Sequence, residues 1–145
     1  KMFIPLLLYR KTKDGSRPQD LHSKCDNKGT TITFIQLIDN SIFGGYTEIG
    51  WEGKGPKKDK ASFIFNSNGK FEAKNDRECI YCDPEYGPTF GTPFHYEILF
   101  EKSLDKGETV GGNFEKCTFF DDTKKIYENV KWDVKEIEVY KIIYI

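Results

Sequence analysis

Ile42-Phe-Gly-Gly-Tyr-Thr47, running on to Trp51, places two adjacent glycines between large apolar residues where the pattern otherwise predicts a β-strand. The run before it, Thr31-Ile-Thr-Phe-Ile-Gln-Leu-Ile38, also predicts a strand, with apolar residues on both faces. We therefore expect that strand to be covered on both sides. Since only the compact turn Asp39-Asn-Ser41 separates the two runs, residues 31 to 51 are predicted to form an antiparallel hairpin.

The paired glycines need an explanation of their own. Each glycine in a strand interior costs about 0.5–1 kcal/mol relative to alanine. A phosphate-binding loop would require a helix directly after the glycines, whereas Tyr46 to Trp51 continues the strand pattern. We therefore predict that Gly44 and Gly45 make room for a close neighbour or a bulge.

The rest of the chain also favours strands. A Ser16-Arg-Pro-Gln19 capping box predicts a short surface helix from about residue 17 to 25. Loops are expected at 11–15, 53–60, 83–92 and 101–113, the last being the most mobile, while residues 114–130 show no clean period. Further strands are expected at 61–65, 70–73, 78–82, 94–100 and 134–143. In the last of these, Ile137, Val139 and Ile143 are expected to share the buried face. The predicted fold class is mainly β (α+β), a two-sheet antiparallel β-sandwich with one or two peripheral helices.

Size and charge limit the functional classes. We expect one domain over residues 1–145, excised from a longer chain because Lys1 precedes Met2, and a monomer. The 22 basic and 23 acidic residues give a net charge of −1, so no long-range field would attract nucleic acid. The apolar opening from Met2 to Leu8 is shorter than the roughly 20 residues of a membrane span. The lysines at 54, 57, 58 and 60 predict a solvated loop.

Four cysteines, Cys25, Cys79, Cys82 and Cys117, are predicted to be reduced thiols in a cytoplasmic protein. Cys79-Ile-Tyr-Cys82 has the spacing of half a zinc site or of a dithiol redox pair. The remaining zinc ligands would have to come from Cys25, Cys117, His22 or His95, at spacings typical of no zinc finger. A redox pair normally opens a helix, which lowers the thiol pKa. Buried or incidental thiols are favoured, and no metal or cofactor is expected.

Other polar and aromatic groups provide no catalytic residues. His22 is expected to cap or pack, and the pairs Glu136/Glu138 and Asp121-Asp122 to be solvated surface carboxylates. Tyr46, Trp51, Tyr86 and Phe90 lie near glycine-rich loops and could form a platform that stacks on sugars, but core packing is the commoner role of such rings.

Several blocks together resemble the TLDc domain, in the form common in single-celled eukaryotes. They follow the family's order over nearly the whole chain: Leu7-Leu-Tyr-Arg10, Asp14-Gly15, Leu21-His22, Cys25-Asp-Asn-Lys-Gly29, Thr31 to Ile35, Phe43-Gly-Gly-Tyr-Thr47, Trp51, Ala61 with Phe63 to Phe65, Gly87-Pro-Thr-Phe-Gly91 and Glu136 to Lys141. The motif residues to which we assign a structural role are Asp26, Gly29, Phe43, Gly44, Gly45, Tyr46, Trp51, Phe63, Phe65, Gly87, Phe90 and Gly91.

This resemblance implies a β-sandwich edged by helices and a non-enzymatic protein-interaction module. It further implies a link to oxidative-stress resistance and to regulation of the vacuolar proton-pumping ATPase, whose subunits would be the protein partners. No catalytic residues come with the family. The chain departs from animal members between Cys79 and Gly91 and in the loop 101–113. Two alternatives stay open at this point: cysteine-based redox activity at Cys79 and Cys82, and a carbohydrate-binding β-sandwich.

Overall fold

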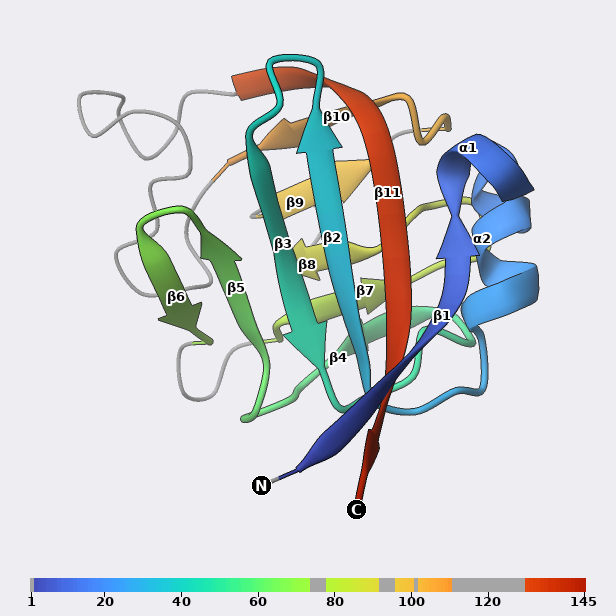
Figure 1. Cartoon of the computed structure of the whole chain (residues 1–145), viewed down its shortest axis with the longest axis vertical. Helices are drawn as coiled ribbons and strands as arrows, with labels where there is room; N and C mark the ends of the chain where they lie inside the picture. The colour runs from blue at the N-terminus through green and yellow to red at the C-terminus, as the bar shows by residue number, and fades with distance from the viewer. Residues whose placement is uncertain (1, 74–77, 92–95, 101, 111–129) are drawn as a thin grey trace.

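The computed structural model describes residues 2–73, 78–91, 96–100, 102–110 and 130–145. Within these residues the chain forms eleven strands and two short helices (Figure 1). The strands are β1 (Phe3–Arg10), β2 (Thr31–Leu37), β3 (Ile42–Thr47), β4 (Gly55–Lys57), β5 (Phe63–Asn66), β6 (Gly69–Glu72), β7 (Ile80–Cys82), β8 (Thr89–Gly91), β9 (Tyr96–Phe100), β10 (Lys106–Thr109) and β11 (Val130–Tyr144). The helices are α1 (Lys11–Asp14) and α2 (Pro18–Cys25).

The strands form two packed layers that are joined through β11. The first residues of β11 pair with β10, and its later residues pair with β2 on one side and β1 on the other, all antiparallel. The strand order is β4-β7-β8-β9-β10-β11-β2-β3-β5-β6. In Figure 1 the layer containing β11, β2 and β3 lies across β7, β8 and β9. The predicted mainly β sandwich is therefore confirmed, and its two layers are one continuous antiparallel sheet folded over on itself.

A register shift between Val134 and Glu136 marks where β11 passes from one layer to the other. Before the shift, Trp132 and Val134 are buried, and after it Ile137 and Val139 are buried. The predicted inward face of this strand is confirmed for Ile137 and Val139. It is wrong for Ile143, which is 37% exposed because it lies close to the end of β11.

The core fills the space between the layers. Large side chains that are completely or almost completely buried include Tyr9, Phe43, Trp51, Phe90 and Phe100. Trp51 and Phe90 meet edge to face with ring centroids 5.4 Å apart, an arrangement that aromatic pairs prefer. Phe43 and Phe100 each make a similar contact with Trp132, at 5.1 Å and 5.3 Å.

The predicted hairpin is confirmed, because β2 and β3 pair from Thr31↔Thr47 to Gln36↔Ile42. The strand ends earlier than expected, at Thr47, and the chain bends before Trp51. Trp51 then turns into the core, where its indole Nε1 donates to Thr31 Oγ1 at 3.0 Å. The glycines do admit close neighbours: a Cβ on Gly45 would lie 2.3 Å from Phe90 Cζ.

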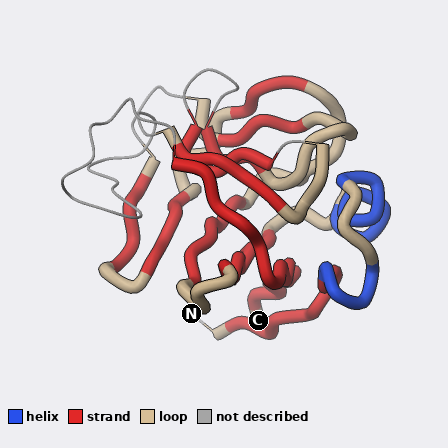
Figure 2. The backbone as a smooth tube through the Cα atoms, turned by 90° about the horizontal axis from the view of Figure 1, so that it is seen from above, coloured by secondary structure: helices blue, strands red, loops and turns tan. Residues whose placement is uncertain are grey.

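Helix α2 confirms the predicted helix, with Leu21 and Cys25 fully buried one turn apart. It packs against β1, and Figure 2 shows both helices together on one side of the strands. The predicted capping pair is wrong. Arg17, instead of Ser16, precedes the helix, and its backbone N–H donates to Asp20 Oδ2 at 3.1 Å. Residues 11–14, expected as loop, form α1.

Three strands were predicted as loops. They are β4 within 53–60, β8 within 83–92 and β10 within 101–113. Each is three or four residues long and contains glycine or proline. Such short glycine- or proline-containing segments favour the prediction of a turn. Lys57, expected in a solvated loop, donates from Nζ to the carbonyls of Gly50 and Glu52. The loop 101–113, which we expect to be the most mobile, lies partly outside the described residues. Residues 114–129 lie wholly outside them, and so do Cys117, His95 and Asp121-Asp122.

Candidate functional site

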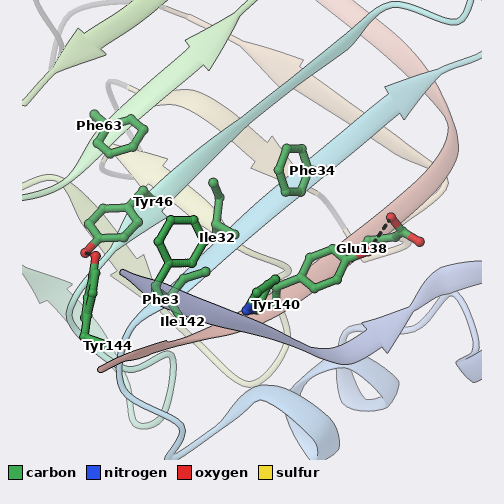
Figure 3. A pocket seen from close by; sticks show the side chains of 10 residues that line it. Phe3, Ile32, Phe34, Tyr46, Phe63, Glu138, Tyr140, Ile142 and Tyr144 are labelled. Atoms are coloured by element: carbon green, nitrogen blue, oxygen red, sulfur yellow. Dashed lines mark hydrogen bonds between the residues drawn. The ribbon is translucent and has the colours of Figure 1, made fainter. Parts of the chain in front are cut away.

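An aromatic groove crosses the outer face of the β11–β2–β3 layer. Its volume is about 710 Å³, within the range of about 300–1,000 Å³ typical of ligand sites. Figure 3 shows its side chains directed away from the sandwich core and toward one another. The lining residues come from β1, β2, β3, β5 and β11: Phe3, Pro5, Ile32, Phe34, Tyr46, Phe63, Glu138, Tyr140, Ile142 and Tyr144.

The groove follows from the alternation of side chains along β2 and β11. In β2 the inward residues, such as Thr33 and Ile35, are buried, whereas Ile32 and Phe34 on the other face are only partly covered. The prediction that β2 is covered on both faces is therefore wrong among the described residues. The apolar pattern on its outer face was nonetheless the sequence signal for this groove.

Ring contacts build the floor of the groove. Phe34 meets Phe65 at 5.3 Å and Tyr140 at 6.0 Å between centroids, both edge to face. Tyr46 and Phe63 stack at 4.9 Å with an interplanar angle of 13°. Gly44 admits Phe65 to this surface, because a Cβ on Gly44 would lie 2.8 Å from Phe65 Cζ.

Polar groups mark the two ends of the groove. At one end the Tyr46 and Tyr144 hydroxyls lie 2.6 Å apart, and Tyr46 also donates to Glu48 Oε2 at 3.0 Å. Burial, followed by these hydrogen bonds, raises the pKa of Tyr46. At the other end Glu138 accepts from Tyr140 at 3.1 Å and from Arg10 Nε at 2.8 Å. Burial and the Glu138 carboxylate likewise raise the pKa of Tyr140. Both phenols therefore stay protonated at neutral pH.

Glu136 and Glu138 are not the solvated carboxylates that were predicted. Both are partly buried, and both bind the segment that leads from β1 into α1. Arg10 Nη2 lies 2.6 Å from Glu138 Oε2, and the backbone N–H of Thr12 donates to Glu136 Oε1 at 3.1 Å. Their role is to fasten the end of β1 to β11.

The candidate redox thiols are fully buried. Asp59 N–H donates to Cys79 Sγ at 3.0 Å, while Cys82 Sγ faces the carbonyl of Gly50 at 3.5 Å. Burial is the largest influence on both thiols and raises the pKa of each. A raised pKa disfavours the thiolate, which is the reactive form. Cys25, Cys79 and Cys82 are all free thiols.

His22 joins helix α2 to the loop after β7, as its predicted packing role requires. Its Nδ1 lies 2.6 Å from Asp26 Oδ1 and its Nε2 lies 2.7 Å from the Tyr86 carbonyl. Both nitrogens are therefore engaged. Within the described residues no group of three or more His, Cys, Asp or Glu side chains could hold a metal ion.

The aromatic platform for sugars, the less favoured alternative, is not formed by the four rings proposed for it. Trp51 and Phe90 are core residues, 1% and 0% exposed. Tyr46 belongs to the groove, and Tyr86 contacts Tyr81 at 5.9 Å on a different strand pair. The four rings therefore present no common exposed surface.

The other motif residues are distributed between core, turns and groove. Phe43, Phe90 and Gly45 lie in or against the core, and Phe63 and Phe65 lie on the outer face with Tyr46. Gly29 and Gly91 have φ of 71° and 119°, which favour glycine. A Cβ on Gly87 would lie 2.5 Å from Leu104 Cδ2, and Asp26 follows α2 and accepts from His22.

A family model for the TLDc domain matches residues 3–143, nearly the whole chain. The comparison with curated proteins found no match. In addition, no helix among the described residues is long and apolar enough to span a membrane.

Proposed function

The chain belongs to the TLDc domain family, and from this membership we propose that it is a cytoplasmic, non-enzymatic interaction module that regulates the vacuolar proton-pumping ATPase. TLDc domains are generally linked to oxidative-stress resistance. In this proposal the chain acts as a monomer that contributes to that resistance by surface contact with ATPase subunits.

The observation that carries the proposal is the aromatic groove. Binding sites are typically concave and lined mainly by apolar and aromatic side chains with a few polar groups, and here rings from five strands line one groove. The thiols, by contrast, are buried with raised pKa values, and the rings of the supposed sugar platform are separated. The geometry thus supports binding better than either redox chemistry or carbohydrate recognition.

A binding measurement with defined subunits tests the proposal. Immobilised protein would be exposed to purified peripheral-stalk subunits of the vacuolar ATPase in biolayer interferometry, and proton pumping by reconstituted ATPase would be followed with and without the protein. We expect saturable binding and a changed pumping rate. Folded protein that neither binds nor alters pumping would remove the ATPase from the proposal.

A further inference from the structure

We propose that the aromatic groove binds an apolar peptide segment of the partner protein and that a Lys or Arg of this segment pairs with Glu48. The inference deepens the proposed interaction function and rests on it. It specifies which face of the domain binds and what chemistry the partner segment must carry.

The apolar part of the proposal rests on exposure. Phe3 is 53% exposed and Tyr144 is 38% exposed at the end of the groove where these two residues pair across β1 and β11. Ile32, Phe34 and Phe63 are only partly covered. Burying such rings and aliphatic groups contributes about 25 cal/mol per Å² of apolar surface. An aliphatic or aromatic segment laid along the groove therefore gains most of its affinity from these side chains.

The basic part of the proposal rests on an uncompensated charge. The exposed carboxylate of Glu48 accepts a hydrogen bond from Tyr46, and among the described residues it makes no ion pair. The carboxylate at the opposite end is already neutralised, since Glu138 pairs with Arg10 at 2.6 Å. Within the described part of the chain, Glu48 thus places a carboxylate without an ion pair beside Tyr46 at one end of the groove, and a positive group on the occupant would complement it.

The same surface already accommodates a cation of the chain itself. Lys70 Nζ lies 4.9 Å from the centroid of Phe63, within the range of a cation–π contact. Phe63 stacks on Tyr46, and Tyr46 donates to Glu48. A partner lysine or arginine at Glu48 would therefore lie next to an aromatic pair that already contacts an ammonium group. Figure 3 places Tyr46 and Tyr144 together, away from Glu138, so the basic residue of the segment would lie at the Tyr46 end of the groove.

A peptide library displayed on phage would test the inference with the complete 145-residue chain. The library would be selected on the wild-type protein and counter-selected on Ile32→Glu, which places a charge in the groove floor. Phe3→Glu, at a more exposed position, serves if Ile32→Glu does not fold. We expect enriched peptides that combine aliphatic or aromatic residues with one Lys or Arg.

Charge exchange then tests the contact with Glu48. Glu48→Lys should weaken binding of an enriched synthetic peptide at least tenfold, and replacing the peptide's basic residue by Glu should restore most of the loss. The matched control is Glu78→Lys, an exposed position two residues before β7 in the other layer, which should leave the dissociation constant unchanged. Circular dichroism would verify that each variant is folded.

Four results would overturn the inference, the last of them obtained with the stalk subunits. One is no enrichment above the counter-selected background, and another is enriched peptides whose binding ignores Glu48→Lys. The third is concentration-dependent dimerisation in sedimentation that Ile32→Glu or Phe3→Glu abolishes, because a second copy would then occupy the groove. If stalk subunits bind wild type and groove variants equally, the proposed function stands and the groove assignment fails. If groove-dependent peptides are found but no stalk subunit binds, the groove assignment stands and the ATPase is removed from the proposed function.

Discussion

Gly44 and Gly45 point to opposite faces of β3, and each leaves space that a different neighbour fills. On the inner face Phe90 from the other layer occupies the space beside Gly45; on the outer face Phe65 and the carbonyl of Thr33 lie against Gly44. The pair therefore sets how closely the layers approach and how flat the groove floor is. A single glycine would leave space on only one face of the strand, so the two adjacent glycines together leave space on both faces.

Replacing Gly45 by Val should destabilise the fold by about 1–3 kcal/mol, because the new side chain would overlap the buried Phe90 ring. Thermal melting followed by circular dichroism measures the loss. A double-mutant cycle supplies the control: in a Phe90→Leu background the smaller change Gly45→Ala should cost less than it does in wild type. An unchanged melting temperature for Gly45→Val would contradict the packing role.

The buried thiols should resist modification in the folded protein. Burial raises the pKa of Cys79 and Cys82 and raises that of Cys25 to about 12, so little thiolate forms at neutral pH. We expect iodoacetamide to label all three only after unfolding in urea, as followed by mass spectrometry of separated peptides. Rapid labelling of folded Cys82 would instead revive the redox alternative.

His22 links helix α2 to the loop after β7 through both of its ring nitrogens. Replacing His22 by Ala would leave Asp26 Oδ1 and the Tyr86 carbonyl without their present partner. The expected cost is about 1–3 kcal/mol, measured by urea denaturation. Lys24→Ala, at an exposed position on the same helix, should change stability little. Equal midpoints for the two variants would mean that the link contributes nothing.

Elements with long apolar patterns could be predicted from the sequence, and short paired segments could not. The runs around Ile35, Phe43 and Val139 are rich in apolar residues over several positions, and all three form strands. Thr89-Phe-Gly91 is a strand because Phe90 pairs with Ile80 and Ile98 on neighbouring strands, which is tertiary context that local propensity does not contain. The cap at Arg17 likewise depends on backbone geometry, which residue types alone do not predict.

The groove was missed for a related reason. Apolar residues on both faces of residues 31–38 predict two covered faces, whereas Ile32 and Phe34 line a groove left open by the described residues. Its other members, such as Phe3, Phe63 and Tyr144, come from segments distant in sequence. Only the pairing of β1 with β11 and of β3 with β5 brings them together.

At the scale of the whole molecule, stability should fall in alkaline solution. Burial, the largest influence, raises the pKa of Cys25 from 9.0 to about 12 and also raises that of Tyr9. In the unfolded chain these groups lose their protons at lower pH, so the stabilisation is complete below about pH 9 and is lost as pH rises toward the folded values.

Melting temperature measured from about pH 8 to pH 11 should therefore decline above pH 9. The decline should be shallower in Cys25→Ala, which removes one of the groups but retains Tyr9. A profile that stays flat above pH 9, or equal slopes for the two proteins, would contradict the assignment of these buried groups.

Strand β11 is paired with β10, β2 and β1, and this has a consequence for biosynthesis. A ribosome delivers β1 and β2 long before their shared partner, so Tyr9 and Ile35 emerge without the strand beside which they will be buried. Nascent chains stalled before residue 130 should therefore remain sensitive to protease and bind chaperones. Release of the later residues should close both layers in a single late step.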